Sequence, residues 1–374
     1  MIRIYRHRCC LIGVLVMVLV GFATPTIPMR DYLGEWLRPT PDGVFLNPAD
    51  LAGRGELAVA PRVSVNWGLR YVSEQRVRYV YDQFENTIGE AVFADNIGFN
   101  WVPGPVSIVY PFRRFALGAG LAPVRDFHYR YLKEYRDEFY VKIGEDRLEQ
   151  GGFLYSGNIA AAFKPIKFIA LGAGFCYAWG ERELKSTMVR GLDTVNFSVK
   201  SGPKGLGWNA GLTVAPLLRF SAGLSYQSRL RFNGPDSFDL KGYPGRGEVE
   251  LNYQAPGQLP SQVKLVVGTE AWSEIYPGFH NVIYVQTTVE HIMLNSVRLR
   301  YGFGLRPLFT DPTVHRVEAL FGLGFNAGRY RINLDGNLNR EALNASDFAL
   351  IPEDADFRAY ETKFNLRTGM EYEF

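Results

Sequence analysis

Residues 358–374, RAYETKFNLRTGMEYEF, alternate almost without interruption between large, mostly apolar side chains and polar or small ones. One set comprises Tyr360, Thr362, Phe364, Leu366, Thr368, Met370, Tyr372 and Phe374. Because side chains of a strand point to opposite faces with period two, the segment is predicted to be one long strand with two unlike faces. A tilted membrane-spanning strand needs roughly 9–11 residues. We therefore predict an all-β fold, a transmembrane antiparallel β-barrel that this strand closes.

The predicted closing strand ends on an aromatic residue, Phe374. An apolar terminal strand with an unpaired edge would promote aggregation, and closing a barrel onto the first strand removes that edge. We also expect the barrel-assembly machinery to engage this strand as a partner.

The N-terminus has the features of a secretory signal peptide. Arg3, Arg6 and Arg8 precede an uncharged apolar run over 11–22, and Gly21 and Ala23 are small residues suited to cleavage. The run is too short for a comfortable transmembrane helix. We expect residues 1–23 to be removed. Both N-terminal cysteines precede the apolar run, so lipidation is not expected.

Composition supports a barrel. The chain has 41 Lys and Arg against 38 Asp and Glu, and removing 1–23 takes away three Arg, which leaves no net charge. A nucleic-acid binder would show a clustered basic excess. No later stretch is long and apolar enough for a spanning helix, so a barrel is the remaining way to satisfy backbone groups in a membrane. Cys176 is the single remaining cysteine, so no internal disulfide is expected.

The two-faced pattern recurs along the chain and predicts about fourteen strands. An even number places both ends on the same, periplasmic side. The expected domains are the signal peptide over 1–23, an N-terminal hatch or plug over 24–56 that folds inside the lumen, and a barrel over 57–374. The expected strands are 57–71, 96–110, 114–131, 152–163, 167–179, 206–215, 218–231, 247–254, 262–272, 281–293, 296–306, 314–327, 329–338 and 358–374. Longer polar stretches, expected as extracellular loops, are 132–151, 180–205, 231–246, 307–313 and 339–357.

Several arginines fall on the face of these strands that should line the lumen. They are Arg62, Arg70, Arg298, Arg300 and Arg306. One interpretation is structural: buried charge must be paired, and Glu318, Glu361 and Glu371 are candidate partners. The other is functional: a guanidinium can receive the carboxylate of an amphipathic ligand through bidentate hydrogen bonds.

Residues 24–56 precede the first predicted strand and lack its period. The segment is rich in turn-forming residues and contains Asn47-Pro48-Ala49. It could be a leader outside the barrel, or it could fill a lumen too wide for side chains alone. Pro48 biases Asn47 away from helix, so we expect a turn there near the periplasmic end.

Residues 45–52, FLNPADLA, resemble the Asn-Pro-Ala motif in the N-terminal hatch of the long-chain fatty-acid transporter (FadL-type) family. Residues 115–121 and 315–317 resemble that family in layout. The resemblance implies fourteen strands around a small N-terminal plug, and hydrophobic molecules that leave sideways where the third strand kinks. The hatch of this chain is short and its polar loops are modest.

Ala122-Pro123-Val124 interrupts the pattern of the expected third strand. Proline cannot donate to a ladder and is confined in sheets to edges, strand starts and bulges. In one interpretation Pro123 bends the strand and opens the lateral exit that the resemblance implies. In the other, the strand ends at Leu121 and Pro123 belongs to a loop.

No motif indicates catalysis, so no catalytic residue, metal or cofactor is expected. Gly118, Gly120, Gly172 and Gly174 lie inside strands rather than before a helix, so they fit small lumen-facing positions better than a phosphate loop. The four histidines after residue 23 lack metal-ligand spacing. A Ser–His dyad formed only in space stays open, although no motif favours it.

We expect a non-enzymatic protein of a Gram-negative-type outer membrane that passively transports hydrophobic or amphipathic, fatty-acid-like molecules. Its expected partners are a hydrophobic small molecule and outer-membrane lipid, not nucleic acid. The alternatives are a barrel that docks secreted or surface proteins, and a weakly selective porin. Single-channel conductance should separate a porin from the other two.

Overall fold

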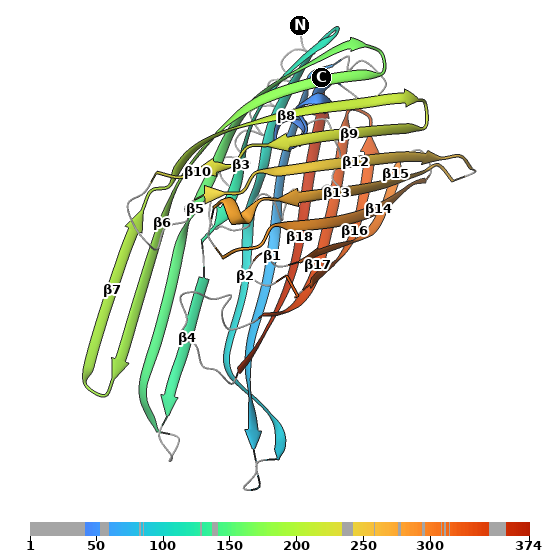
Figure 1. Cartoon of the computed structure of the whole chain (residues 1–374). Coiled ribbons are helices and arrows are strands. Elements are labelled where there is room, and N and C mark those ends of the chain that lie inside the picture. Colours follow the sequence, from blue (N-terminus) through green and yellow to red (C-terminus); the bar gives the residue numbers. More distant parts are fainter. Residues whose placement is uncertain are drawn as a thin grey trace, which may run out of the picture.

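The fold is a closed antiparallel β-barrel, as the strand pattern predicts. The computed structural model describes residues 42–52 and 60–374, apart from gaps at 82–83, 85, 128, 137–140, 234–241, 258, 276–277, 294–295, 308, 310–311, 314 and 344–356. In these residues the main sheet has sixteen strands in the order β4-β5-β3-β2-β1-β18-β17-β16-β15-β14-β13-β12-β9-β8-β6-β7. Pairing of β5 with β6 closes the wall, and β4 and β7 pair only with those two strands. Fourteen strands therefore form the barrel (Figure 1).

Most strands match their expected ranges. The wall strands are β1 (Arg62–Tyr81), β2 (Thr87–Phe112), β3 (Phe115–Asp126), β5 (Lys142–Ile166), β6 (Ile169–Arg190), β8 (Lys204–Leu217), β9 (Phe220–Gln227), β12 (Arg246–Ala255), β13 (Ser261–Glu270), β14 (Val282–Met293), β15 (Val297–Pro307), β16 (His315–Ala327), β17 (Tyr330–Leu343) and β18 (Phe357–Glu373). The shorter elements are β4 (Tyr129–Arg136), β7 (Asp193–Ser201), β10 (Leu230–Arg231), β11 (Gly242–Tyr243), η1 (Asp42–Val44), η2 (Pro48–Ala52) and η3 (Trp272–Glu274).

Exposure alternates along the strands as their sequences predict. In β15, Phe303 is 57% exposed, whereas Arg300 is 4% exposed. In β18, Asn365, Arg367 and Glu371 are buried inside the barrel. The closing ladder pairs β18 with β1 from Arg62 opposite Glu373 to Arg78 opposite Phe357. Because the polar face is turned inward and the apolar face outward, the wall has the polarity of a transmembrane barrel.

One end of the barrel, here called the turn end, carries the short connections and the end of β18. The other, the loop end, carries the longer connections. The expectation that 132–151 and 180–205 are loops is wrong. There β4, β5, β6 and β7 form a β-extension at the loop end (Figure 1). In β7 the apolar Val195, Phe197 and Val199 alternate with polar residues, but the side chains on both faces are mostly exposed. The ladder continues because backbone pairing does not depend on burial of one face.

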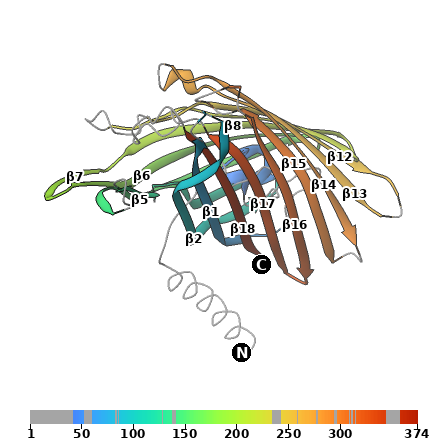
Figure 2. The same cartoon turned by 90° about the horizontal axis from the view of Figure 1, so that it is seen from below.

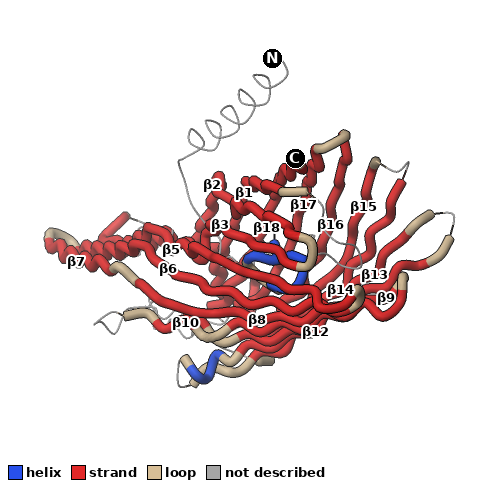
Figure 3. The backbone as a smooth tube through the Cα atoms, turned by 90° about the horizontal axis from the view of Figure 1, so that it is seen from above, coloured by secondary structure: helices blue, strands red, loops and turns tan. Residues whose placement is uncertain are grey.

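The described part of the N-terminal segment, residues 42–52, lies inside the barrel (Figures 2 and 3). Its two short helices, η1 and η2, lie against β2, β3, β5, β6 and β8. The predicted signal peptide and the rest of 24–56 lie outside the described residues. Among the residues that the structure describes, no helix has the length and hydropathy needed to cross a bilayer.

Candidate functional site

The Asn-Pro-Ala motif forms a turn inside the barrel. The Asn47 carbonyl accepts a hydrogen bond from the Asp50 N–H at 3.0 Å, and its side-chain oxygen accepts one from the Ala49 N–H at 3.2 Å. Pro48 begins η2, where a missing N–H costs nothing. The side-chain amide of Asn47 donates to the Thr213 hydroxyl at 3.2 Å. Thr213 lies near the end of β8, so this contact is close to the turn end of the barrel.

Inward-facing glycines make room for the segment, as expected for small lumen positions. A Cβ at Gly172 would lie 2.3 Å from the Ala49 backbone nitrogen, and one at Gly211 would lie 1.8 Å from the Asn47 side-chain oxygen. A Cβ at Gly118 would lie 2.6 Å from a Val44 methyl carbon. These glycines come from β6, β8 and β3, so three strands together form a recess for η1 and η2. We call this recess the glycine seat.

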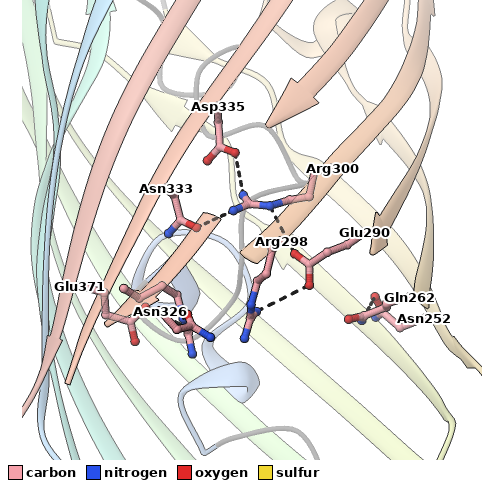
Figure 4. Close-up of polar contacts among 10 residues, drawn as sticks. Asn252, Gln262, Glu290, Arg298, Arg300, Asn326, Asn333, Asp335 and Glu371 are labelled. Carbon is pink, nitrogen blue, oxygen red and sulfur yellow. Dashed lines mark hydrogen bonds and ion pairs between the residues drawn. The ribbon is translucent and has the colours of Figure 1, made fainter. Parts of the chain in front are cut away.

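A network of buried charges lines the opposite wall, on β14 to β18 (Figure 4). Arg300 lies 2.6 Å from Asp335 and 3.3 Å from Glu290. Arg298 lies 3.6 Å from the same Glu290, and Arg367 lies 3.9 Å from Asp335. Each buried charge here has a partner of opposite sign, and removing one partner would leave a costly unpaired charge.

Three other arginines from the sequence analysis lie elsewhere. Arg62 is 3.4 Å from Glu373 and 3.9 Å from Glu371, at the turn end. Arg306 is 2.5 Å from Glu270, at the loop end. The Arg70 side chain lies outside the described part. The structure therefore does not gather the five arginines into one site. Of the expected acidic partners Glu371 does pair with an arginine, whereas Glu270, Glu290 and Asp335 were missed although each occupies an inward position of an expected strand.

An aromatic cluster that the sequence analysis missed packs over the loop end above Arg306. Trp272 stacks on Phe309 with ring centroids 4.1 Å apart, and Phe279 lies 5.0 Å from Phe309. The Trp272 indole N–H donates to Glu270 at 2.7 Å. The rings come from connections far apart in the sequence, so no local pattern marks them. They tie together the loops that follow β13 and β15.

The hydrogen-bond ladder between β2 and β3 covers only the turn-end part of these strands. It runs from Phe112 opposite Phe115 to Val106 opposite Leu121. Farther toward the loop end, the described residues of β2 are paired with β1 alone, back to Thr87. There β3 and β4 are paired with β5 alone. Among the described residues, the barrel wall thus has a seam where β2 and β3 are no longer paired.

Pro123 lies on one side of this seam. β3 continues through Pro123 to Asp126, so the expectation that the strand ends at Leu121 is wrong. The register against β5 shifts directly after Pro123, which is a β-bulge. Ala122 and Val124 are buried in the apolar core.

Two further prolines lie on the other side of the seam. Pro103 and Pro105 flank Gly104 in β2, immediately before Val106, the last residue paired with β3. Proline lacks the N–H that would extend a ladder, so strands on both sides lose donors at the same level. The alternation over 96–110 predicted one uninterrupted strand, although Pro103-Gly104-Pro105 lies within it. That motif was the available signal.

A Ser–His contact does form, on the outer face near the turn end. The Ser261 hydroxyl lies 2.7 Å from His291 Nδ1, and His291 Nε2 lies 2.9 Å from the Tyr301 hydroxyl. The Ser261 hydroxyl also donates to the Leu259 carbonyl at 3.0 Å. In the described part of the chain, no group of three His, Cys, Asp or Glu residues is placed to hold a metal ion.

No family model matches the chain, and no curated protein matches it. Solved structures do. A Pseudomonas aeruginosa FadL homologue is 14% identical with a TM-score of 0.65, over 95% of this chain and 100% of that one. The P. putida toluene transporter TodX is 13% identical with a TM-score of 0.60, over 89% and 94%. The CymD monoaromatic hydrocarbon channel is 11% identical with a TM-score of 0.57, over 94% and 98%. The chain therefore has the fold that its Asn-Pro-Ala motif indicated.

Proposed function

We propose that this protein is an outer-membrane channel for passive uptake of hydrophobic or amphipathic molecules, which leave through the seam between β2 and β3. The observation that carries the proposal is the end of the β2–β3 ladder at Val106 and Leu121, with prolines on both strands. Proteins described as a FadL homologue and as toluene and monoaromatic hydrocarbon channels share the fold.

The physical argument starts from the barrier that such molecules meet. The polar surface of an outer membrane slows apolar solutes, whereas a protected path can deliver them to the hydrocarbon layer. Such transport needs neither an energy source nor chemistry. A lateral seam suits this task because the solute never has to cross the polar turn end of the lumen. Ala122, Pro123 and Val124 form one side of this proposed exit.

The N-terminal segment is proposed to act as a plug over 24–56, with the glycine seat and Thr213 holding its described part. A plugged channel would conduct ions poorly, whereas a porin would show large, steady conductance. The barrel-assembly machinery is proposed to bind the terminal segment that closes the barrel, which consists of β18 and the aromatic Phe374 that follows it.

The lumen arginines are also proposed to recognise the carboxylate of an amphipathic substrate. Arg298 and Arg300 already contact Glu290 and Asp335, so a substrate would have to exchange with those carboxylates. Bidentate guanidinium geometry permits such exchange. Saturable uptake of a fatty acid, lost in Arg298→Gln, would support this part.

The lateral exit is tested with a double variant of the β2 edge of the seam, Pro103→Val together with Pro105→Val, here called the lip variant. It restores two N–H donors at the seam, and Pro111→Val in the paired part of the same strand is the matched control. In cells lacking other uptake routes, we expect the lip variant to take up radiolabelled dodecanoate more slowly than the control. Equal uptake by both variants and the unchanged protein would refute the exit. A docking barrel would show no uptake in any of them.

A further inference from the structure

The ring of Phe45 lies at the inner end of the seam. A Cβ at Gly120 would lie 2.4 Å from the Phe45 Cζ, so the tip of the ring rests over the Gly120 backbone. Gly120 pairs with Ser107 in β2, and the next pair, Leu121 opposite Val106, is the last of the ladder. The ring therefore lies against the last paired residues of β2 and β3, next to the start of the seam.

The backbone of Phe45 is anchored to strands away from the seam. Its carbonyl accepts hydrogen bonds from Gln227 of β9 at 2.5 Å and from Asn209 of β8 at 3.5 Å. The ring itself, in a residue only 1% exposed, is held by apolar packing. Ala122 is the next inward position of β3, and both residues belong to one buried apolar cluster. Apolar packing has no directional requirement, so an apolar molecule of similar shape can replace the ring.

We propose that Phe45 is the specificity-determining residue of the exit. Its ring occupies the position that the departing molecule takes. This inference rests on the proposed function. To reach the seam, a molecule takes the place of the phenyl ring over Gly120. The site accepts apolar groups with about the cross-section of one phenyl ring, such as an alkyl chain or a single aromatic ring. It excludes wide fused-ring compounds.

The absence of a side chain at Gly120 is part of this site. A Cβ at Gly120 would overlap the Phe45 ring at 2.4 Å. The next nearest group would be the Val106 carbonyl oxygen of β2, at 2.9 Å. Gly120→Ala is therefore expected to displace the Phe45 ring and to narrow the passage at the same time.

The test compares two radiolabelled probes, dodecanoate as a slender chain and pyrene as a wide fused ring. We expect Phe45→Ala to raise pyrene uptake several-fold and to change dodecanoate uptake little. Leu46→Ala, in the same turn, is the matched control and should leave the ratio unchanged. Gly120→Ala should lower dodecanoate uptake, and adding Phe45→Ala should restore it. Heat-modifiable gel mobility shows whether each variant is folded.

The outcomes separate this inference from the proposed function. If the lip variant slows dodecanoate uptake while Phe45→Ala leaves the pyrene ratio unchanged, the exit stands and the role of Phe45 is refuted. A missing rescue of Gly120→Ala by Phe45→Ala refutes it as well. If neither the lip variant nor any Phe45 or Gly120 variant alters uptake, both proposals fail together.

Discussion

The Asn47 amide and the Thr213 hydroxyl, 166 positions apart in the sequence, lie 3.2 Å apart inside the barrel. Thr213 in turn donates to the Asp50 carboxylate at 2.7 Å. One wall threonine thus contacts residues on both sides of Pro48 and holds the first turn of η2. A single hydroxyl of β8 links the Asn-Pro-Ala motif to the wall.

Thr213→Val should loosen that link with little change in side-chain volume. It removes both hydrogen bonds and leaves the Asn47 amide and the Asp50 carboxylate each with one partner fewer. A buried group without its partner costs about 1–3 kcal/mol. We expect more frequent channel openings in single-channel recordings because the segment detaches more often. Thr288→Val, a buried threonine on β14, is the control, and recordings identical to those of the unchanged protein would contradict the prediction.

Gly172→Ala should displace the segment through backbone clashes. The new Cβ would lie 2.3 Å from backbone atoms of both Pro48 and Ala49, which cannot rotate away as a side chain can. We expect a cysteine at position 49, in a Cys176→Ser background, to react faster with a water-soluble maleimide. Gly304→Ala is the control because its nearest neighbour would be 3.8 Å away. Equal labelling in both variants would mean that the glycine seat does not hold the segment.

Asp335→Ala should destabilise the barrel strongly. Asp335 is 1% exposed and faces Arg300 at 2.6 Å and Arg367 at 3.9 Å. Removing one partner of a buried pair costs about 3–5 kcal/mol. Urea unfolding followed by tryptophan fluorescence should show the loss.

The control for Asp335→Ala is Glu274→Ala, which removes an ion pair with Arg229 whose side chains are 52% and 43% exposed. An exposed pair of this kind contributes about 0–1 kcal/mol. If both variants unfold at the same urea concentration, the buried network does not stabilise the wall.

Deleting residues 24–52 should raise ion conductance in a correctly inserted barrel. The described part of the deleted segment is buried against the inner wall, so its loss opens space in the lumen. Planar-bilayer recordings provide the measurement, and heat-modifiable mobility confirms insertion. Unchanged conductance would disprove the plug.

The strands were predictable because alternation is a local property. Most wall strands show their two faces in their own residues, whatever their neighbours are. The exceptions include the loop-end parts of β1 and β2, which extend beyond the expected 57–71 and 96–110. The β-extension was missed because 132–151 and 180–205 are rich in charged and polar residues. Within β7 the polarity does alternate, but both faces are mostly exposed, and backbone pairing sustains the strand.

The candidate site was predictable only in part. Asn47-Pro48-Ala49 was identified by its resemblance to the hatch motif of the FadL-type family, and Pro123 because proline restricts the backbone wherever it occurs. Of the arginine partners, Glu371 was predicted. Glu290 and Asp335 were not, because their pairing depends on the register between the strands. Pro103 and Pro105 matter only because they lie level with Pro123 across the seam.

The sequence by itself determined that this chain is a barrel with a polar inner face, because side-chain periodicity requires no knowledge of strand neighbours. Only the tertiary structure decided where the ladder stops, which glycines form the seat and that Phe45 lies over Gly120. Those contacts join residues far apart in the chain. They depend on register, and a shift of one residue would turn every inward side chain outward.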